Sequence, residues 1–322
     1  MVPVERLRLI TKVARLYYEH GLRQPEIARQ LSLSQAMVSR LLTAAHSEGI
    51  VRTTVTTPAG VYMELEEELE RRYQLKDVVV ADCATENRDE VLRAIGSAAA
   101  AYLEAALGTE EIVGISSWSE TLLRTVGSMQ QQRRAGDSHV VQILGGIGNP
   151  DAEVHAIHLT KQMASLLKAK AHFLTAPGVT SSAAAAATYR KEPQVQQTMA
   201  YFDRLTVALV GIGTLRPSRL LGESGNFFPA SDLADLEKLG AVGDICLRFF
   251  DGAGQRVNSP LDERVVAISL GQLARVPRAV GVAGTAEKFG AIQAAVTGRL
   301  VNVLVTDRFT AERLASEKTR EG

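Results

Sequence analysis

The stretch SLSQAMVSRLLTAAHSEGIV, residues 32–51, decides how the start of the chain is interpreted. It predicts a helix over residues 35–47, which Ser34 can cap through its hydroxyl. The apolar residues of this helix recur at the spacing of one buried face, and they are Val38, Leu41 and Leu42. A helix held on one side and polar on the other can simply be packed, or it can present its polar side to a partner.

Two further helices are expected before this one. Residues 4–21, VERLRLITKVARLYYEHG, end at a glycine and carry an apolar stripe of Leu9, Val13, Leu16 and Tyr17. Residues 24–31, QPEIARQL, hold proline in the first turn, where it is tolerated, and direct inward Ile27, Ala28 and Leu31. Because Ala28 is small and residues 32–34 form a short turn, the second and third helices can cross steeply. This spacing predicts a DNA-binding helix-turn-helix.

The polar face of the helix-turn-helix supplies candidate contacts to DNA. Arginine and glutamine side chains can pair with guanine and adenine edges, and hydroxyls can reach phosphates or bases. The segment IVRTTV after Gly49 predicts a strand, hence a winged module whose wing touches phosphate. The candidates are Gln24, Ser34, Gln35, Ala36, Ser39, Arg40, Thr43 and, in the wing, Arg52. The alternative is a plain helical hairpin in a globular core.

Charge and composition agree with a nucleic-acid-binding head on a larger body. The net charge is zero, but residues 1–60 hold eight Lys and Arg against four Asp and Glu, and the remainder is acidic. No run of eighteen apolar residues occurs, and the charged start of the chain is unlike a secretory signal. Cys83 and Cys246 stand apart in apolar runs, as buried thiols of a cytoplasmic protein do.

Residues 56–60 break the pattern with Pro58 and Gly60, and a helix is expected over residues 61–76. One side of that helix is apolar at a spacing of four, through Val61, Leu65, Leu69 and Tyr73. So short a stripe needs a partner, which can be the body of its own chain or the same helix of a second subunit. The chain therefore divides into a head (1–57), a linker or oligomerisation helix (58–76) and a body (77–322).

In the body, short apolar strands alternate with helical patterns, which predicts a mostly parallel α/β sheet covered on both faces. Strands are expected at 77–82, 111–116, 138–144, 171–175, 204–210, 244–250, 277–283 and 302–306. Helices are expected at 87–107, 119–133, 152–169, 194–202, 231–239, 285–298 and 308–318.

Ligands of such sheets bind beyond the carboxyl ends of the strands, where this chain carries hydroxyls and glycines. Hydroxyls and backbone N–H groups at helix starts suit an anion such as phosphate, although glycine after a strand is more often a plain turn. Asp244 can accept from a sugar hydroxyl or cap a strand end, and Lys288 can add a charge. The other candidates are Ser116, Ser117, Ser119, Glu120, Thr121, Gly145, Gly146, Gly211, Gly213 and Thr214.

Other chemistries find little support in the sequence. Gly211-x-Gly213 lacks the third glycine of a dinucleotide fingerprint, and no phosphate loop of the GxxxxGK type occurs. Trp118 stands where a nucleophile elbow needs glycine. Glu153, His155 and His158 lack the spacing of a zinc motif and are more often solvated or packed side chains. We therefore predict no catalytic residue, no cofactor and no metal.

Taken over nearly its full length, the chain resembles the SorC family of sugar-responsive transcriptional regulators. The head matches in EIARQLSLSQAMVSRLLTAAHSEGIV, and the body in GISSWSETL, VVQILGG, GIGT, GDICLRFFDGAGQ and GTAEKFGAIQAAVTGRLVNVLVTDRFTAERLA. The resemblance implies a body similar in fold to glucosamine-6-phosphate deaminase and ribose-5-phosphate isomerase, without their catalysis. It also implies a phosphorylated sugar or sugar-like inducer and dimers or tetramers. One departure is Trp118-Ser119, where many relatives show Trp-Gly.

These observations predict a DNA-binding regulator whose operator affinity changes when a carbohydrate, phosphorylated or free, binds the body. The chain would bind double-stranded DNA, the sugar and copies of itself, with no membrane contact. Two rivals are a sugar-phosphate isomerase or deaminase with a DNA-binding head, and a scaffold whose helix-turn-helix contacts protein.

Overall fold

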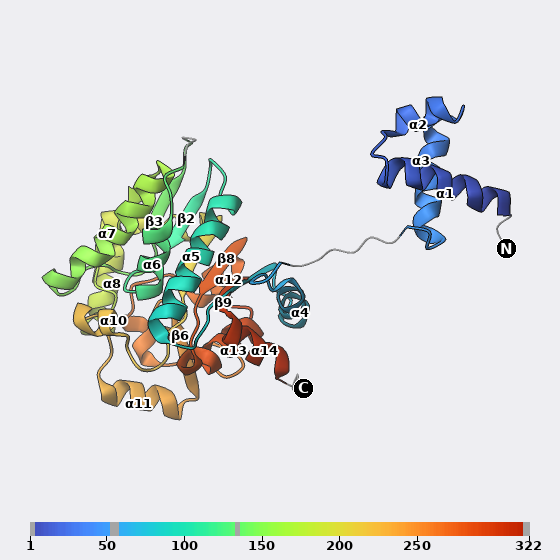
Figure 1. Ribbon diagram of the computed structural model, residues 1–322. Coiled ribbons are helices and arrows are strands. Elements are labelled where there is room, and N and C mark those ends of the chain that lie inside the picture. Colours follow the sequence, from blue (N-terminus) through green and yellow to red (C-terminus); the bar gives the residue numbers. More distant parts are fainter. Residues whose placement is uncertain (1–3, 52–57, 133–135, 318–322) are drawn as a thin grey trace. The chain divides into compact units, whose positions relative to one another are not determined.

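The computed structural model describes residues 4–51, 58–132 and 136–317 (Figure 1). It divides into two compact units, residues 1–58 and residues 59–322, which we call the head and the body. Each is described by itself. No helix in the described ranges has both the length and the apolar character needed to cross a membrane.

The head is a three-helix unit made of α1 (Val4–Tyr18), α2 (Gln24–Gln30) and α3 (Gln35–Ser47). Its small core forms around fully buried Ile10, Val13, Ile27, Val38 and Ala45. The expected inward stripe of α1 is wrong in one place, since Tyr17 is 36% exposed and Ile10 and Ala14 are buried instead. The buried side of α1 is thus formed by Ile10, Val13 and Ala14, and this helix contacts both α3 and α2.

The turn between α2 and α3 closes by backbone hydrogen bonds. Ser32 adopts a left-handed conformation with φ of 54°, and the amide of Leu33 donates to the Ala28 carbonyl at 2.9 Å. This is a Schellman-type helix end with serine in the place usually taken by glycine. Ser34 then caps α3 as predicted, its hydroxyl accepting from the Met37 amide at 3.2 Å. The expected wing strand with Arg52 lies mostly outside the described residues.

A seven-stranded parallel sheet forms the centre of the body, in the order β1-β9-β8-β5-β2-β3-β4. It confirms the predicted α/β class. Seven of the eight expected strands correspond to these strands: β1 (Asp77–Ala81), β2 (Ile112–Ile115), β3 (His139–Gln142), β4 (Lys170–His172), β5 (Val207–Gly211), β8 (Arg278–Val282) and β9 (Val303–Asp307).

Each face of the sheet carries its own core. One core packs α5 (Arg88–Ala106), α6 (Glu120–Ser128) and α7 (Pro150–Leu167) on the strands, with α5 and α6 side by side (Figure 1). The other core packs α12 (Leu270–Arg275), α13 (Phe289–Thr297) and α14 (Arg308–Ser316), together with α8 (Ala183–Lys191) and α9 (Pro193–Met199). Alternate strand residues, such as Leu209 and Val210, point into opposite cores. Two more helices, α10 (Arg219–Ser224) and α11 (Ala230–Lys238), follow β5.

The eighth expected strand, 244–250, is a correction. These residues belong to an antiparallel hairpin of β6 (Ala241–Ile245) and β7 (Arg248–Asp251), separate from the main sheet. The hairpin turns at Cys246 and Leu247, both with positive φ, and neither residue carries the Gly or Asn signal of such a turn. The helix expected over 285–298 also starts later, because Thr285 has φ of 85° and a short 3₁₀ turn precedes α13.

The linker helix α4 (Met63–Tyr73) packs on the body of its own chain, against α14 and β1. Leu69 is fully buried, and the Tyr73 hydroxyl donates to the Leu314 carbonyl at 3.1 Å. Val61, by contrast, is 43% exposed. Two carboxylates of α4 accept from the free side of edge strand β1: Glu66 from the Val80 amide at 2.8 Å and Glu70 from the Val78 amide at 3.2 Å. The body of its own chain is therefore the partner that the structure provides for this apolar stripe.

Candidate functional site

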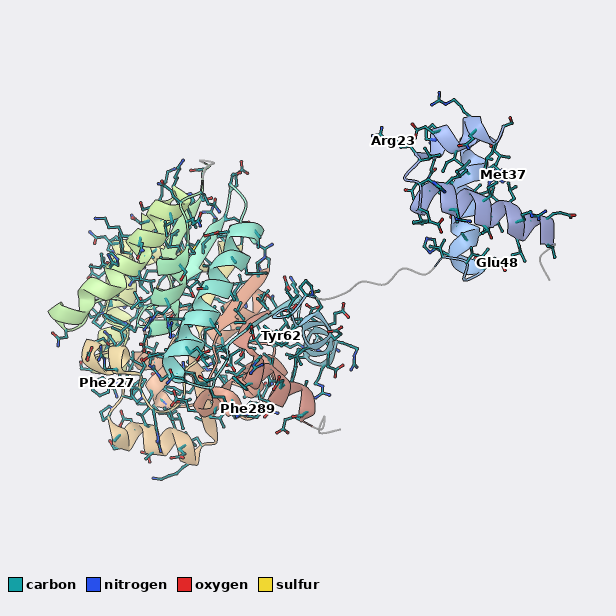
Figure 2. The ribbon with its side chains drawn as sticks, in the orientation of Figure 1. Arg23, Met37, Glu48, Tyr62, Phe227 and Phe289 are labelled. Atoms are coloured by element: carbon teal, nitrogen blue, oxygen red, sulfur yellow. The ribbon has the colours of Figure 1, made fainter. Side chains whose placement is uncertain are left out.

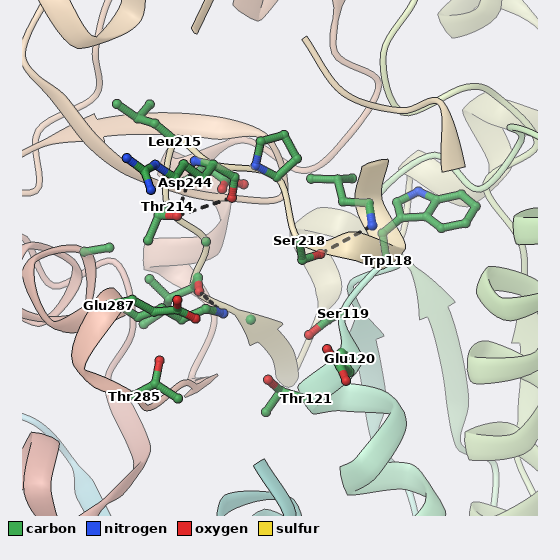
Figure 3. Close-up of a pocket in the computed structure, with 18 of the residues that line it drawn as sticks. Trp118, Ser119, Glu120, Thr121, Thr214, Leu215, Ser218, Asp244, Thr285 and Glu287 are labelled. Carbon is green, nitrogen blue, oxygen red and sulfur yellow. Dashed lines mark hydrogen bonds between the residues drawn. The ribbon is translucent and has the colours of Figure 1, made fainter. Parts of the chain in front are cut away.

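A cavity of about 960 Å³ opens at the carboxyl ends of β8, β5 and β2, which are consecutive in the sheet (Figure 3). The chain leaves β2 through α6 toward β3 on one side, and it leaves β5 toward β8 on the other. Neighbouring loops that depart in opposite directions leave a crevice, the usual ligand position in open α/β sheets. The β6–β7 hairpin and the start of α5 close its sides.

Ten of the twelve predicted effector residues line this cavity: Ser116, Ser117, Ser119, Glu120, Thr121, Gly211, Gly213, Thr214, Asp244 and Lys288. Gly145 and Gly146 do not, which corrects that expectation. The Gly145 carbonyl accepts from the Trp118 indole at 3.1 Å, and a Cβ on Gly145 would come within 2.5 Å of the Pro177 backbone. The glycines therefore permit close backbone packing behind Trp118.

The hydroxyl groups of the serine-rich loop after β2 largely form hydrogen bonds with other groups of the protein. The Ser117 hydroxyl donates to the Leu144 carbonyl at 3.0 Å and accepts from the Gln142 amide at 2.8 Å. Ser119 caps α6, its hydroxyl accepting from the Leu122 amide at 3.3 Å. A side chain on Gly211 would come within 2.8 Å of that hydroxyl, so Gly211 makes room for Ser119.

Glu120, the first residue of α6, pairs with Arg88 of α5 at 2.8 Å. This hydrogen bond lowers the pKa of the Glu120 carboxyl and raises that of the Arg88 guanidinium. Glu287 approaches the same guanidinium at 3.8 Å. Arg88 is thus engaged by two carboxylates at the mouth of the cavity.

Asp244 projects from β6 over the β5 loop. Gly213 and Asp244 exchange two backbone hydrogen bonds, at 2.9 and 3.1 Å, and a Cβ on Gly213 would overlap the Asp244 carboxylate. One carboxylate oxygen accepts from the Leu247 amide at 2.9 Å. Enclosure by protein raises the pKa of Asp244 to about 6, although the Leu247 amide and the Lys288 ammonium favour its charged form.

Lys288 donates to the Ile212 carbonyl at 2.9 Å and so ties the β8 loop to the β5 loop. Burial lowers the pKa of its ammonium, and the Asp244 carboxylate opposes that shift. The two groups form a partly desolvated acid and base pair in one cavity. Such a pair can bind hydroxyl groups through one acceptor and one donor.

Four cavity residues hold left-handed backbone conformations that L-residues rarely adopt: Trp118, Cys246, Leu247 and Thr285, with φ between 53° and 85°. Such conformations cost roughly 1–3 kcal/mol each and cluster at ligand sites. The Thr285 hydroxyl adds a second irregularity. It is buried and lacks a hydrogen-bond partner within the described part of the chain.

Sequence reasoning missed several residues that line the cavity, among them Arg88, Arg216, Ser218, Arg219 and Thr285. Arg88 follows β1, whose loop was not considered, although the rule that loops after strands bind ligands applies to it equally. Thr285 lies three residues before Lys288 in the β8 loop, so the same rule would have found it. Arg216 and Arg219 come from a crossover whose path no local pattern predicts.

In the head, Gln35, Ala36, Ser39, Arg40 and Thr43 all lie exposed on α3. Ser34 is exposed and engaged as the cap, and Gln24, at the start of α2, is half-buried. Met37 projects from the same helix with 41% of its surface exposed (Figure 2). An apolar side chain there can contact a thymine methyl group.

Known proteins match this chain over both the head and the body. Residues 58–316 match the family model described as "Putative sugar-binding domain". The chain is 32% identical to the sorbitol operon regulator of Klebsiella pneumoniae over 96% of this chain and 98% of that protein. The crystal structure of that full-length regulator, SorC, superposes with a TM-score of 0.74, covering 96% of this chain and 99% of the other.

The chain belongs to the SorC family. A second relative, the deoxyribonucleoside regulator of Bacillus subtilis (strain 168), is 31% identical over 97% of this chain and 99% of that protein. Because the SorC-family match runs through head and body alike, the chain is a transcriptional regulator with a sugar-binding domain. The cavity described above lies within the matched region.

Proposed function

We propose that this SorC-family regulator binds operator DNA through its head and a sugar or sugar phosphate in the body cavity. Two features found in one chain carry the proposal. One is an exposed polar helix that follows a tight turn, and the other is a large cavity at the topological switch point between β2 and β5. Either feature alone occurs in many proteins. Together they make a two-site protein in which one ligand can change affinity for the other.

The DNA site consists of α3 and the residues around its start. Arg40 and Gln35 reach base edges, Ser39 and Thr43 reach bases or phosphates, and Gln24 and Ser34 position the backbone. Arg52, which lies outside the described residues, would add a phosphate contact. Two heads read two half-sites, so copies of the chain act in pairs or as tetramers, in the cytoplasm beside the chromosome.

The effector site is the cavity around Asp244. Asp244, Lys288 and the β2 loop hydroxyls hold the carbohydrate. Because α4 is fastened to the body, a body rearrangement moves the residues that precede α4. The hydroxyl of Tyr62, the residue just before α4, donates to the Asp82 carboxylate at 2.6 Å and so holds the start of α4 on the body (Figure 2). A carbohydrate that prefers one body arrangement therefore shifts the population of operator-binding pairs.

Catalysis is not part of the proposal, and the relatives it rests on are named as regulators. Asp244 and Lys288 supply an acid and a base, which keeps a sugar-phosphate isomerase as the second candidate. A turnover assay on pentose and hexose phosphates separates the two. Product formation at rates well above background would support the enzyme.

The direct test is fluorescence anisotropy with labelled DNA from upstream of the protein's own gene. We expect sequence-selective binding that weakens with salt, and one carbohydrate that shifts it. Absence of selective binding at every salt concentration would remove the DNA half of the proposal. Selective binding that no carbohydrate alters would remove the effector half.

A further inference from the structure

Helix α14 begins at a buried carboxylate that also holds a loop of the cavity. Asp307, 1% exposed, ends β9 and caps α14, and one of its oxygens accepts from the Thr310 amide at 2.9 Å. Its other oxygen accepts from the Thr310 hydroxyl at 2.7 Å and from the amide of Thr285, in the β8 loop, at 3.0 Å. A Cβ on Gly284 would come within 2.4 Å of that second oxygen, so the loop backbone lies directly against it. The start of α14 and the cavity loop therefore share one acceptor group.

The shared carboxylate holds a strained residue of that loop. Thr285 has φ of 85° and ψ of 148°, a backbone conformation that almost only glycine adopts and that persists where the surroundings impose it. The Thr285 hydroxyl is buried and has no partner within the described part of the chain, so its amide provides the hold. The Thr285 carbonyl in turn accepts from the amide of Lys288, whose side chain lines the cavity, at 3.1 Å. A movement of the loop at Lys288 therefore reaches Asp307 through Thr285.

A second cavity loop is fastened to the same helix. Glu86 lies in the loop between β1 and α5, and Arg88 at the end of that loop borders the mouth of the cavity. Both carboxylate oxygens of Glu86 accept from Arg313 of α14, at 2.9 and 2.8 Å. The two side chains of this pair are 41% and 45% exposed, which makes it the weaker of the two connections. Two loops beside the cavity thus bear on α14, one of them through a buried carboxylate.

The far end of α14 holds the linker helix α4, which lies beside it (Figure 1). The Leu314 carbonyl accepts from the Tyr73 hydroxyl at 3.1 Å and from the Arg72 guanidinium at 3.0 Å. The Glu317 carbonyl, just beyond the helix, accepts from the same guanidinium at 2.7 Å. Seven residues of helix separate the cap from Leu314, a rise of about 10 Å. A helix this short moves as one piece, so a displacement of its cap is also a displacement of the groups that hold α4.

We propose that α14 connects the cavity to the linker helix, with Asp307 as the positioning residue that joins them. The inference rests on the proposed function and specifies how that site is regulated. A ligand that moves the β8 loop moves the Thr285 amide, the cap of α14 follows, and the Leu314 carbonyl carries with it the two α4 side chains that it holds. Helix shifts of about 1–2 Å are sufficient for switches of this kind.

Hydrogen exchange on the full chain, followed amide by amide and without ligand, tests the connection from both ends. In Asp307→Asn the Thr285 amide and the start of α14 lose a charged acceptor, and we expect exchange of the α4 amides to accelerate about tenfold. In Tyr73→Phe only a hydroxyl at the far end is lost, and we expect exchange of the Thr285 amide to accelerate about threefold. Coupling between two sites is reciprocal, so both effects have to appear.

Each variant has a matched control. Ser182→Ala removes the cap of α8, which has nine residues as α14 does and does not line the cavity. Loss of that cap costs the same kind of stability, and we expect it to leave α4 exchange unchanged. Glu66→Ala loosens α4 from β1 rather than from α14, so the Thr285 amide should not respond to it.

Three results would overturn the inference. The first is α4 exchange that Asp307→Asn leaves unchanged, and the second is an equal acceleration in α5, on the opposite face of the sheet, which a loss of global stability alone would give. The third is a Thr285 amide that responds to Glu66→Ala as much as to Tyr73→Phe. If Asp307→Asn does not fold, the comparison of Glu66→Ala with Tyr73→Phe decides.

Operator anisotropy on the unaltered chain separates failure of the inference from failure of the proposed function. Selective operator binding together with uncoupled exchange keeps the function and removes the inference. Coupled exchange in a chain that binds no operator selectively removes the function and leaves the connection through α14 in place.

Discussion

The buried carboxyl of Asp244 makes the stability of the body depend on pH. Its carboxyl is enclosed, its neighbours include the Lys288 ammonium and the Cys246 thiol, and its pKa rises from 3.8 to about 6. Because the folded-state pKa lies above the unfolded one, the folded chain holds the extra proton. The body is therefore most stable with respect to this group below pH 4, and it loses that stability as the pH rises from about 4 to about 6.

Asp244→Asn keeps an oxygen acceptor for the Leu247 amide and removes the buried charge. We expect the variant body to exceed the original in unfolding free energy by up to about 3 kcal/mol at pH 7.5, and by little at pH 4. Urea unfolding at several pH values measures the difference, with Glu64→Gln, an exposed site on α4, as control. A difference that does not depend on pH would contradict the assignment.

Arg40 is the residue of α3 best placed for a guanine edge, since it is exposed and, among the residues that the structure describes, its side chain bonds only to the Ala36 carbonyl of its own helix. Arg40→Ala should weaken operator binding by about 1–3 kcal/mol and relax the base preference at one position. Anisotropy on a set of single-base operator variants reports both quantities. Lys12→Ala on α1 removes one positive charge from the head as well, and we expect it to leave the base preference intact.

At the scale of elements, helix α4 both packs on the body and supplies hydrogen-bond acceptors to an edge strand. Its apolar side packs against α14 and β1, and its Glu66 and Glu70 accept from the Val80 and Val78 amides of edge strand β1. Burial raises the pKa of Glu66, as expected for a carboxylate enclosed against a strand. An uncovered edge strand is a site of aggregation, so α4 also protects the sheet.

Replacing Glu66 or Glu70 by alanine leaves a strand amide without its acceptor. We expect each change to lower the unfolding free energy of the body by about 1–3 kcal/mol, and the double variant to aggregate faster. Urea midpoints and light scattering are the measurements. Glu67→Ala, exposed on the same helix, should change stability by less than about 0.5 kcal/mol. Equal effects at Glu67 and Glu66 would show that helix propensity, not strand capping, is responsible.

The sequence predicted elements that follow one strong local signal. Continuous apolar strands and the Ser34 cap were predicted correctly because each leaves a pattern within a few residues. The β6–β7 hairpin was not, because Cys246 and Leu247 hold left-handed conformations that only the surrounding contacts stabilise. The cavity residues that directly follow a strand could be predicted, because a strand leaves a local pattern. Arg216 could not, because it lies on a crossover that leaves none. Gly145 was misassigned because a glycine after a strand serves backbone packing as readily as a ligand.

On the scale of the whole molecule, the basic head and the acidic body form separate compact units. Each unit carries a candidate site of its own, the polar face of α3 in the head and the cavity in the body. The operator affinity of the chain should fall steeply with salt, because phosphate contacts release counterions.

A fragment of residues 59–322 should fold alone and bind the carbohydrate as the full chain does, because its cores and cavity are complete without the head. It should not bind operator DNA. Calorimetry with and without the ligand checks folding and affinity together. An unfolded fragment, or one with much weaker carbohydrate binding, would show that the head completes the site.

The left-handed residues around the cavity have a further consequence for how such a protein evolves. Glycine at position 285 would relieve local strain, so a selection for heat resistance should find this change early. At positions 246 and 247 glycine would also remove side chains buried in the core, so the same selection should keep Cys246 and Leu247. Glycine at position 285 would loosen the loop that holds Lys288, so a selection for inducibility should reverse it, and the two laboratory lineages would diverge at this codon first.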